Sequence, residues 1–501
     1  MRARIFLLRA LVLAGVAGAL LWPALVNRGP FFNSDTRSYL RAADTAVNRL
    51  THRATVWTAA ESGPAAGSLQ PNSGPAPLAA SGGRTRSLQR IAKRGILLGR
   101  SPYYGLLVYT GTLAAGFWLP VLLQAAALLL AVYLALRALA LPAWPHVAYL
   151  GLALCLVPAA PFFAGYLMPD LFAAIAILAC AVLLSVRRLA VRDLLLWYLL
   201  LSVAMLFHES CTAIAAALLA FAVVVNLLRR SWNNRRGLAV ILFGLLTAFA
   251  GQSLVNYGVK RATGEDALRL PFLSARLVAD GPGTRYLRAT CPASHFALCG
   301  YAHEFPMPDA AFLFGTAPGK SVFETASYRQ RSALSKEQFR FFLAVFRYDP
   351  IGVLEDAARN AAVQLLDFRL ATFHYGASMR GVMEQTFPLP VAERIRSSPA
   401  YRGTLPLGAL SVALYAWVLG SLAYLIFVLA GNPRKPLVGG NLKRTIYWMI
   451  AGVAVNAGVC GAFSAVDPRY QARVVWLLPL AAFLAALEAR RQTEQLPARE
   501  P

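Results

Sequence analysis

Charged residues are scarce in this chain of 501 residues, where Asp, Glu, Lys and Arg together make up 14% against 57% hydrophobic residues. Soluble globular domains carry about a quarter charged residues. The mean hydropathy is +0.52. This scarcity excludes an ordinary soluble protein, and the long apolar runs predict an all-α polytopic membrane protein.

Acidic residues are scarcer still, with 23 against 49 Lys and Arg, so the formal net charge is +26. So basic a chain is often a nucleic-acid-binding protein. Here the apolar runs make phospholipid head groups and phosphate-bearing lipid substrates the expected partners instead. We therefore predict contact with membrane lipids and no nucleic-acid partner.

Cysteine is also sparse, with six residues. Four lie within apolar runs and are expected to be small core residues: Cys155, Cys180, Cys211 and Cys460. The other two, Cys291 and Cys299, alternate with His295 and His303 at a four-residue spacing that invites a zinc site. Pro292 argues against one helix carrying all four. In an oxidising compartment a disulfide between Cys291 and Cys299 is favoured, with free thiols or a metal as alternatives.

Ten apolar runs predict membrane-spanning helices. They cover residues 5–26, 117–139, 146–163, 171–186, 194–207, 212–228, 238–255, 405–429, 446–463 and 474–487. For the first run a cleaved signal peptide is the alternative. Several runs are short, which suits helices that end below the surface around a cavity.

The spans divide the chain into four parts. Residues 1–256 form an N-terminal transmembrane module with an outer loop at 27–116. Residues 257–402 are polar and too long for a connecting loop, so we expect a folded extracytoplasmic domain of mixed structure. The closing transmembrane helices lie within 403–489, and 490–501 form a cytoplasmic tail.

The outer loop is uneven in composition. A helix-compatible stretch at residues 39–60 is followed by a Gly-, Pro-, Ser- and Ala-rich insert at 62–83, which cannot bury enough apolar surface to order itself. Residues 84–100 are basic and amphipathic, as expected of a helix lying on an anionic membrane surface.

Basic residues mark the connections on the side of the N-terminus, and the positive-inside rule makes that side cytoplasmic. They are Arg137, Arg187, Arg188, Arg192, Arg229, Arg230, Arg235, Arg236, Arg434, Lys435, Lys443, Arg444, Arg490 and Arg491. We therefore expect a multi-pass protein of the plasma membrane, such as a bacterial inner membrane, with both termini cytoplasmic.

Ionisable residues gather on the opposite, extracytoplasmic side. Asp35 follows the first span in the segment 33–39 (NSDTRSY), at a depth where a carboxylate can reach water. Other candidates come from connections far apart in the sequence: Arg100, Tyr103, Asp170, His208, Glu209, Arg469 and Arg473. Their convergence on one face predicts an active site there, with Asp35 as its catalytic residue and the others binding substrate.

Each cluster also has an ordinary structural explanation. Asp170 could cap the helix that follows it, residues 208–209 could be the polar end of a helix, and residues 467–469 could form a turn with an internal ion pair. Arg473 is harder to explain in this way. A guanidinium just inside the last span requires an anion, and a phosphate would serve.

These motifs together resemble a known class of enzymes. An acid after the first span, the sequence RSPYY at residues 100–104, MPD at 168–170, HES at 208–210 and an outer domain before the last spans are similar to the GT-C class of integral membrane glycosyltransferases. The protein mannosyltransferases and the lipid A aminoarabinose transferase belong to this class.

The resemblance implies a GT-C-like bundle with interfacial helices and a polyprenyl-phosphate-sugar donor, with an essential acid that corresponds to Asp35. No acidic pair follows the first span, so the need for a divalent cation stays open. The acceptor, whether glycan, lipid or protein, also stays open.

The chemistry of such a transfer assigns roles to the candidates. We expect Asp35 to orient and deprotonate the acceptor, and Arg100 and Arg473 to stabilise the phosphate leaving group, with inversion at the anomeric carbon. Asp170, His208 and Glu209 would hold substrate, water or a divalent cation. A lipid or polysaccharide transporter and a polysaccharide polymerase or ligase are the alternatives.

Overall fold

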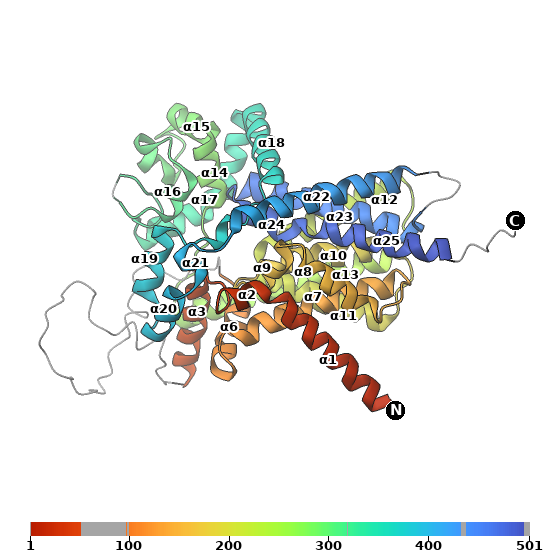
Figure 1. The fold of residues 1–501 in the computed structure, drawn as a ribbon. Helices are drawn as coiled ribbons and strands as arrows, with labels where there is room; N and C mark the ends of the chain where they lie inside the picture. Colours follow the sequence, from red (N-terminus) through yellow and green to blue (C-terminus); the bar gives the residue numbers. More distant parts are fainter. Residues whose placement is uncertain (1, 52–96, 98–99, 318, 432–436, 495–501) are drawn as a thin grey trace, which may run out of the picture.

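The chain is helical throughout the part that the structure describes. The computed structural model describes residues 2–51, 97, 100–317, 319–431 and 437–494 (Figure 1). In these residues the only β-type pairings are two isolated bridges, Phe31 with Tyr166 and Leu97 with Leu268. The predicted insert at 62–83 and most of the predicted interfacial stretch at 84–100 lie outside the described residues.

Six helical segments are long and apolar enough to cross a membrane, by length and composition. They are α7 (Trp118–Ala138), α12 (Glu209–Leu228), α13 (Arg235–Thr263), α22 (Leu407–Ala430), α23 (Gly440–Phe463) and Pro468–Glu494, which comprises α24 (Pro468–Val475) and α25 (Leu477–Glu494). These helices indicate a membrane protein. The predicted count of ten spans is not confirmed among the described residues.

The other predicted spans are shorter helices. They are α1 (Arg2–Leu20), α8 (His146–Cys155), α9 (Ala159–Ala164), α10 (Leu171–Ser185) and α11 (Val191–Phe207). The predicted span at 146–163 is divided between α8 and α9 just before and after Pro158. Proline has no backbone N–H and its ring clashes with the preceding turn, so a continuous helix ends there.

Helix α10 lies at the centre of the bundle. All of its residues are buried, and it packs against α7, α11, α12, α13 and α23. Its uniformly apolar sequence therefore faces other helices, because a helix that is apolar all round is typical of a protein interior as well as of a membrane. Hydropathy by itself does not distinguish these two environments.

The connections rich in basic residues meet at one end of the bundle, which we call the basic end (residues 137–140, 184–193, 226–236, 441–444 and 490–491). Arg444 Nε donates to the carbonyl of Ser185 at 3.2 Å, and Arg491 Nη1 donates to the carbonyl of Ala140 at 2.7 Å. Helix α1 begins and α25 ends toward this side (Figure 1).

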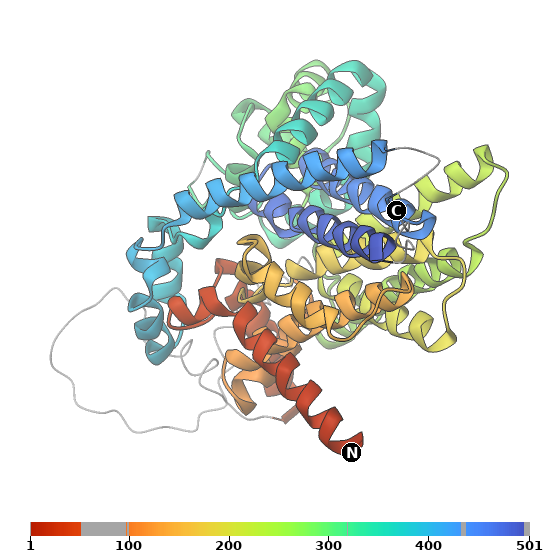
Figure 2. The same cartoon turned by 45° about the vertical axis from the view of Figure 1, so that its right-hand side comes forward.

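A helical layer covers part of the other end. It contains α14 (Phe272–Asp280), α15 (Pro282–Thr290), η1 (Ala297–Glu304), α16 (Asp309–Phe314), α17 (Tyr328–Tyr348) and α18 (Pro350–Leu366). Figures 1 and 2 show these helices as a separate layer beside the C-terminal helices. The layer has its own apolar core, formed by residues between Leu270 and Val353. The described part of this domain contains no strand, so the expectation of mixed structure is wrong.

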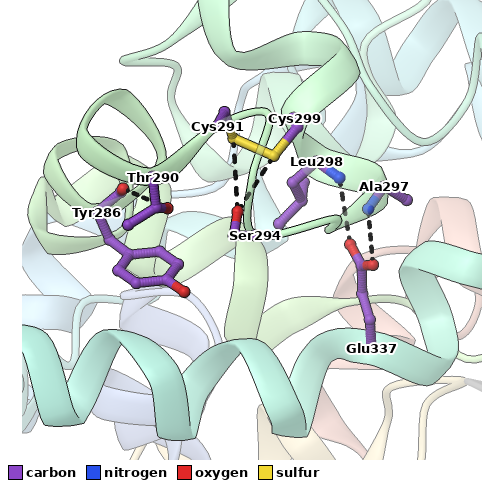
Figure 3. The surroundings of a disulfide bond; sticks show 8 residues. All are labelled: Tyr286, Thr290, Cys291, Ser294, Ala297, Leu298, Cys299 and Glu337. Carbon is purple, nitrogen blue, oxygen red and sulfur yellow. Dashed lines mark hydrogen bonds between the residues drawn. A yellow bond between two sulfur atoms is a disulfide. The ribbon is translucent and has the colours of Figure 1, made fainter.

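A disulfide joins Cys291, the C-cap residue of α15, to Cys299 in η1 (Figure 3). Ser294 Oγ lies 3.4 Å from Cys299 Sγ. On the other side of the loop, the Glu337 carboxylate accepts the backbone N–H groups of Ala297 and Leu298 at 2.8 and 3.3 Å. Because both sulfurs are bonded to each other, the alternative of a zinc site on Cys291, His295, Cys299 and His303 does not apply.

Residues 368–402 pack with the bundle, although the sequence analysis placed them in the outer domain. Phe373, Tyr375, Phe387 and Ile395 are buried in the same apolar core as the membrane helices. Their segment forms η2 (Ala371–Phe373), α19 (Ala377–Thr386), α20 (Leu389–Arg396) and α21 (Pro399–Arg402). It lies close to α2 (Trp22–Val26), α3 (Ser34–Thr51) and α6 (Pro102–Ala114) at the same end of the bundle (Figure 1).

Candidate functional site

Four connections meet at the end of the bundle opposite the basic end, and we call this end the site face (residues 31–36, 165–170, 208–210 and 467–473). The pairing of Phe31 with Tyr166 brings the first two connections together. Phe31 N donates to the Gly165 carbonyl and Leu167 N to the Phe31 carbonyl, both at 2.9 Å. The hydroxyl of Thr36 donates to the carbonyl of Leu167 at 3.0 Å.

Asn33 sets the position of Asp35. Its Oδ1 accepts the backbone N–H of Asp35 at 3.0 Å, as an N-cap side chain does at the start of a helix. Its Nδ2 donates to the hydroxyl of Tyr166 at 2.5 Å. Asp35 therefore lies in the first turn of α3, where the helix dipole favours a carboxylate.

Asp35 forms an ion pair with Arg100. Arg100 Nη2 lies 2.5 Å from Asp35 Oδ1, and each side chain is 22% exposed. The pair joins the start of α3 to Arg100, which stands next to Ser101, the N-cap of α6, and the two paired residues are 65 positions apart in the sequence. Asp35 is thus held in place and still accessible, as a general base must be.

A second ion cluster lies on the same face, and two of its three members are fully buried. Asp170 and Arg473 both have side chains with 0% exposure, and Arg473 Nη1 lies 3.3 Å from Asp170 Oδ1. Arg469 Nε lies 3.7 Å from the same oxygen, and the Arg469 side chain is 11% exposed. Burial alone would raise the pKa of Asp170, but Arg469 and Arg473 outweigh it and hold this pKa below its usual range.

Asp170 stands directly before α10 but does not cap it. Its side chain makes no capping hydrogen bond, and Oδ2 has no hydrogen-bond partner among the described residues. The ordinary explanation of this residue as a helix cap therefore does not hold. Asp170 instead pairs with the buried guanidinium group of Arg473 and the partly exposed one of Arg469.

The Arg473 guanidinium is almost fully occupied by protein groups. Nη2 donates to Ser210 Oγ at 2.9 Å and to Asn456 Oδ1 at 3.2 Å, and it lies 3.3 Å from Cys460 Sγ. Only Nε has no hydrogen-bond partner among the described residues. The sequence analysis expected Arg473 to contact the phosphate of a substrate. With these protein partners and no exposure, its guanidinium has no open side toward a bound phosphate in this structure.

Asn456, Ser210 and Cys460 contact Arg473 but were not among the site residues predicted from the sequence. Asn456 also donates from Nδ2 to the carbonyl of Tyr470 at 2.7 Å and to Gln471 Oε1 at 2.9 Å. An amide inside a predicted span is costly unless its hydrogen bonds are satisfied. That rule was the signal available in the sequence for Asn456, since it lies within the run 446–463.

His208 links the buried cluster to the start of α12. Its Nδ1 accepts the backbone N–H of Ser210 at 3.2 Å and lies 2.8 Å from Ser210 Oγ, so His208 caps α12. Burial, and then the charge of Arg473, lowers the pKa of His208 to about 3. His208 is thus neutral at physiological pH. Residues 208–209 thus form the polar start of α12, as one of the structural explanations from the sequence held, and His208 also contacts Ser210 of the cluster.

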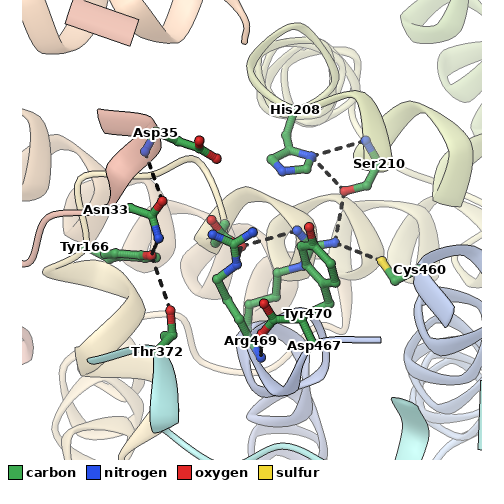
Figure 4. A network of polar contacts seen from close by, with 12 residues as sticks. Asn33, Asp35, Tyr166, His208, Ser210, Thr372, Cys460, Asp467, Arg469 and Tyr470 are labelled. Atoms are coloured by element: carbon green, nitrogen blue, oxygen red, sulfur yellow. Dashed lines mark hydrogen bonds and ion pairs between the residues drawn. The ribbon is translucent and has the colours of Figure 1, made fainter. Parts of the chain in front are cut away.

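Arg469 is the partly exposed member of the ion cluster. Its guanidinium lies over the ring of Tyr470, 4.9 Å from the ring centroid, and its Nε has no hydrogen-bond partner among the described residues. Figure 4 shows Asp35 and His208 on the two sides of the region into which Arg469 points. His208 and Arg469 also interact electrostatically.

The turn at 467–469 contains no internal side-chain ion pair. Asp467 accepts the backbone N–H of Arg469 at 2.8 Å and caps α24, while the Arg469 side chain turns to Asp170. Gln364 of α18 exchanges two hydrogen bonds with the backbone of Asp467, at 2.8 and 2.9 Å. The helical layer that contains α18 therefore anchors the connection that carries Arg469 and Arg473.

Two predicted binding residues, Tyr103 and Glu209, make no hydrogen bond or ion pair with the side chains of this cluster. Tyr103 donates its hydroxyl to the carbonyl of Gly251 at 2.8 Å, which packs α6 against α13. The side chain of Glu209 is exposed and makes no hydrogen bond or ion pair with a described residue, although it interacts electrostatically with Arg269 and Arg100. Among the described residues no group of three or more His, Cys, Asp or Glu is placed to hold a metal ion. Asp170, the buried acid of the site, has arginines as its partners.

No protein-family model, no curated protein and no solved structure matches this chain.

Proposed function

We propose that this chain is a membrane glycosyltransferase that moves a sugar from a polyprenyl-phosphate donor to an acceptor at the site face. The observation that carries the proposal is the accessible ion pair of Asp35 and Arg100 on the same face as the largely buried cluster of Asp170, Arg469 and Arg473. It combines a carboxylate that can accept a proton with guanidinium groups that can hold a phosphate, at the end of a membrane bundle.

The transfer step uses these groups as follows. Asp35 takes the proton of the acceptor hydroxyl while the acceptor oxygen bonds to the anomeric carbon. The bond from that carbon to the phosphate oxygen breaks, and its electron pair stays on the polyprenyl phosphate. Arg100 and Arg469 stabilise the negative charge that develops on this leaving group. Attack opposite the leaving group inverts the anomeric centre.

The buried part of the cluster has a supporting role in this proposal. Arg473 donates to Ser210 and Asn456 and pairs with Asp170, so it ties α12, α23 and α24 together beneath the site. Asp170 sits between Arg469 and Arg473 and keeps the former turned toward the site. Groups fixed in this way need little reorganisation during the reaction.

A transporter is less well supported by the position of these charges. Transporters bind their substrates near the middle of the membrane, between two gates. Here Asp170 directly precedes α10, and Arg469 lies in the first turn of α24. The charged groups thus belong to one end of the bundle, as expected of an enzyme that works on a lipid at the membrane surface.

The orientation in the membrane is part of the proposal, with the basic end in the cytoplasm and the site face outside. Reporter fusions after Arg236 and after Pro468 should report a cytoplasmic and an extracytoplasmic location respectively. The same location for both fusions would contradict this orientation. A fusion after Arg491 should agree with the one after Arg236, because both residues belong to the basic end.

Transfer itself is tested by finding the product and then the donor. The glycolipids and surface glycans of cells with and without the gene should differ by one sugar substituent. Purified protein in liposomes should then release polyprenyl phosphate from the matching donor only when the acceptor is present. Identical glycans in both strains, together with movement of labelled lipid between leaflets by the purified protein, would favour a transporter and refute the transferase.

A further inference from the structure

A pocket separate from the ion clusters lies where the first helices reach the site face. It has a volume of about 230 Å³. Its walls are residues 27–30 and 32, the turn 115–118 between α6 and α7, Tyr375, and residues 394, 395 and 398 around the end of α20. We call it the interface pocket, because it lies at the level where α7, a candidate span, begins at Trp118.

The walls of the interface pocket are held together by hydrogen bonds between distant segments. Asn27 Oδ1 accepts the backbone N–H of Ala400 at 2.9 Å, and Asn27 Nδ2 donates to the carbonyl of Gly29 at 3.0 Å. The backbone N–H of Phe32 donates to the hydroxyl of Tyr375 at 2.7 Å. The pocket is therefore a built feature of the fold rather than a gap between loosely placed loops.

The charge of the lining is positive. Arg28 and Arg394 line the pocket, and no Asp or Glu does. Both arginines are exposed, and neither guanidinium has a hydrogen-bond or ion-pair partner among the described residues. Two such cations at one pocket select an anion, and arginine is suited to phosphate because its N–H groups match the phosphate oxygens.

The remaining walls are aromatic and apolar. Phe32 and Phe117 are buried, and Trp118 stands at the start of a span, where tryptophan typically marks the head-group level of a membrane. Tyr375 is 1% exposed, and its hydroxyl oxygen accepts a hydrogen bond from the backbone N–H of Phe32. The hydroxyl proton of Tyr375 has no acceptor among the described residues. That buried proton is available to an oxygen of a ligand.

We propose that the interface pocket binds the head group of an anionic phospholipid from the leaflet that borders the site face. Arg28 and Arg394 contact the phosphate, Tyr375 donates a further hydrogen bond, and the acyl chains leave past Trp118 along the membrane helices. A free phosphate would satisfy the arginines but would leave the apolar wall of Phe117 and Trp118 without a partner. This site is distinct from the transfer site and does not depend on sugar transfer.

Lipid binding can be measured on the delipidated, purified full-length protein by native mass spectrometry. The probes are phosphatidylglycerol, phosphatidylcholine with the same acyl chains, and inorganic phosphate. The wild type should bind one phosphatidylglycerol more tightly than phosphatidylcholine. Arg28→Gln and Arg394→Gln should each weaken this binding about five-fold, since one basic residue near an anionic lipid surface contributes on this scale. Arg402→Gln, an exposed arginine outside the pocket, is the matched control and should bind as the wild type does.

Two further variants separate the pocket from general surface charge. Ala115→Phe places a ring at an exposed position of the lining and keeps both arginines, so it should weaken phosphatidylglycerol binding. Asp35→Asn lies outside the pocket and should leave phosphatidylglycerol binding unchanged. The proposal is overturned by equal affinity for the two phospholipids, by unaltered binding in Arg394→Gln, or by inorganic phosphate binding as tightly as phosphatidylglycerol. Arg394 is exposed on a short helix, so its variant provides this test even if Arg28→Gln does not fold.

Discussion

Asp35→Asn should lower the rate of sugar transfer by about 100-fold or more, the usual scale for loss of a general base. Asparagine keeps the size of the side chain and leaves the backbone hydrogen bond from Asp35 N to Asn33 Oδ1 intact, so α3 should start at the same residue. It cannot accept the proton of the acceptor. Transfer is measured with purified protein in liposomes that contain the donor and the acceptor.

Donor binding should distinguish loss of the base from loss of structure. Arg100 and Arg469 remain in Asp35→Asn, so the donor should still bind while kcat falls. Asp367→Asn is the matched control: Asp367 also pairs with an arginine, Arg369, and its side chain is 23% exposed against 22% for Asp35. The control should transfer sugar at the wild-type rate. Near-normal transfer by Asp35→Asn would mean that this carboxylate only positions Arg100.

Asp170→Asn should destabilise the protein severely. It removes the negative charge between Arg469 and Arg473 and leaves two guanidinium groups at a site where Asp170 and Arg473 have no exposure. Breaking a buried ion pair on one side costs about 3–5 kcal/mol, because the remaining charge has no partner. We expect loss of monodisperse protein in detergent and a lower unfolding temperature.

A second substitution should restore part of this loss. Asp170→Asn combined with Arg473→Met removes the carboxylate and also the guanidinium that would otherwise stay buried without a partner. Methionine fills much of the space of the arginine side chain. The double variant should unfold at a higher temperature than Asp170→Asn alone, so the two substitutions should not be additive. Additive destabilisation would show that Asp170 and Arg473 contribute independently. Arg473→Ala alone should also be unstable, so any loss of donor binding in this variant would follow from the loss of structure.

Much of the candidate site was predicted from the sequence. Asp35, Asp170, His208 and Arg469 were expected on one face because each lies at the end of an apolar run, and the structure brings them to the same end of the bundle. Tyr103 was selected by its place beside Arg100 in the sequence. In the helix that begins at Pro102, however, neighbouring residues point in different directions, and Tyr103 faces α13.

The spans were predicted less well than the site. Hydropathy is a property of a short stretch of chain, so it marks α10 and the run at 146–163 as apolar without showing what surrounds them. α10 is enclosed by other helices, and the run at 146–163 forms two short helices on either side of Pro158. The outer domain was expected to be of mixed structure, but a polar and irregular sequence pattern is also compatible with short helices joined by turns.

The sequence by itself determined that this is a membrane protein, and it predicted basic connections at one end of the bundle and a mixed set of acidic and basic site residues at the other. Composition and the order of apolar and charged residues are sufficient for this, because each span separates the connections on its two sides. Only the tertiary structure decided which charges neutralise one another. Arg473 meets Asp170 across 303 positions of sequence, and it shares Ser210 and Asn456 as further partners. Such pairings depend on how whole helices pack, since the free energy of a buried charge is set by the groups within a few ångströms of it.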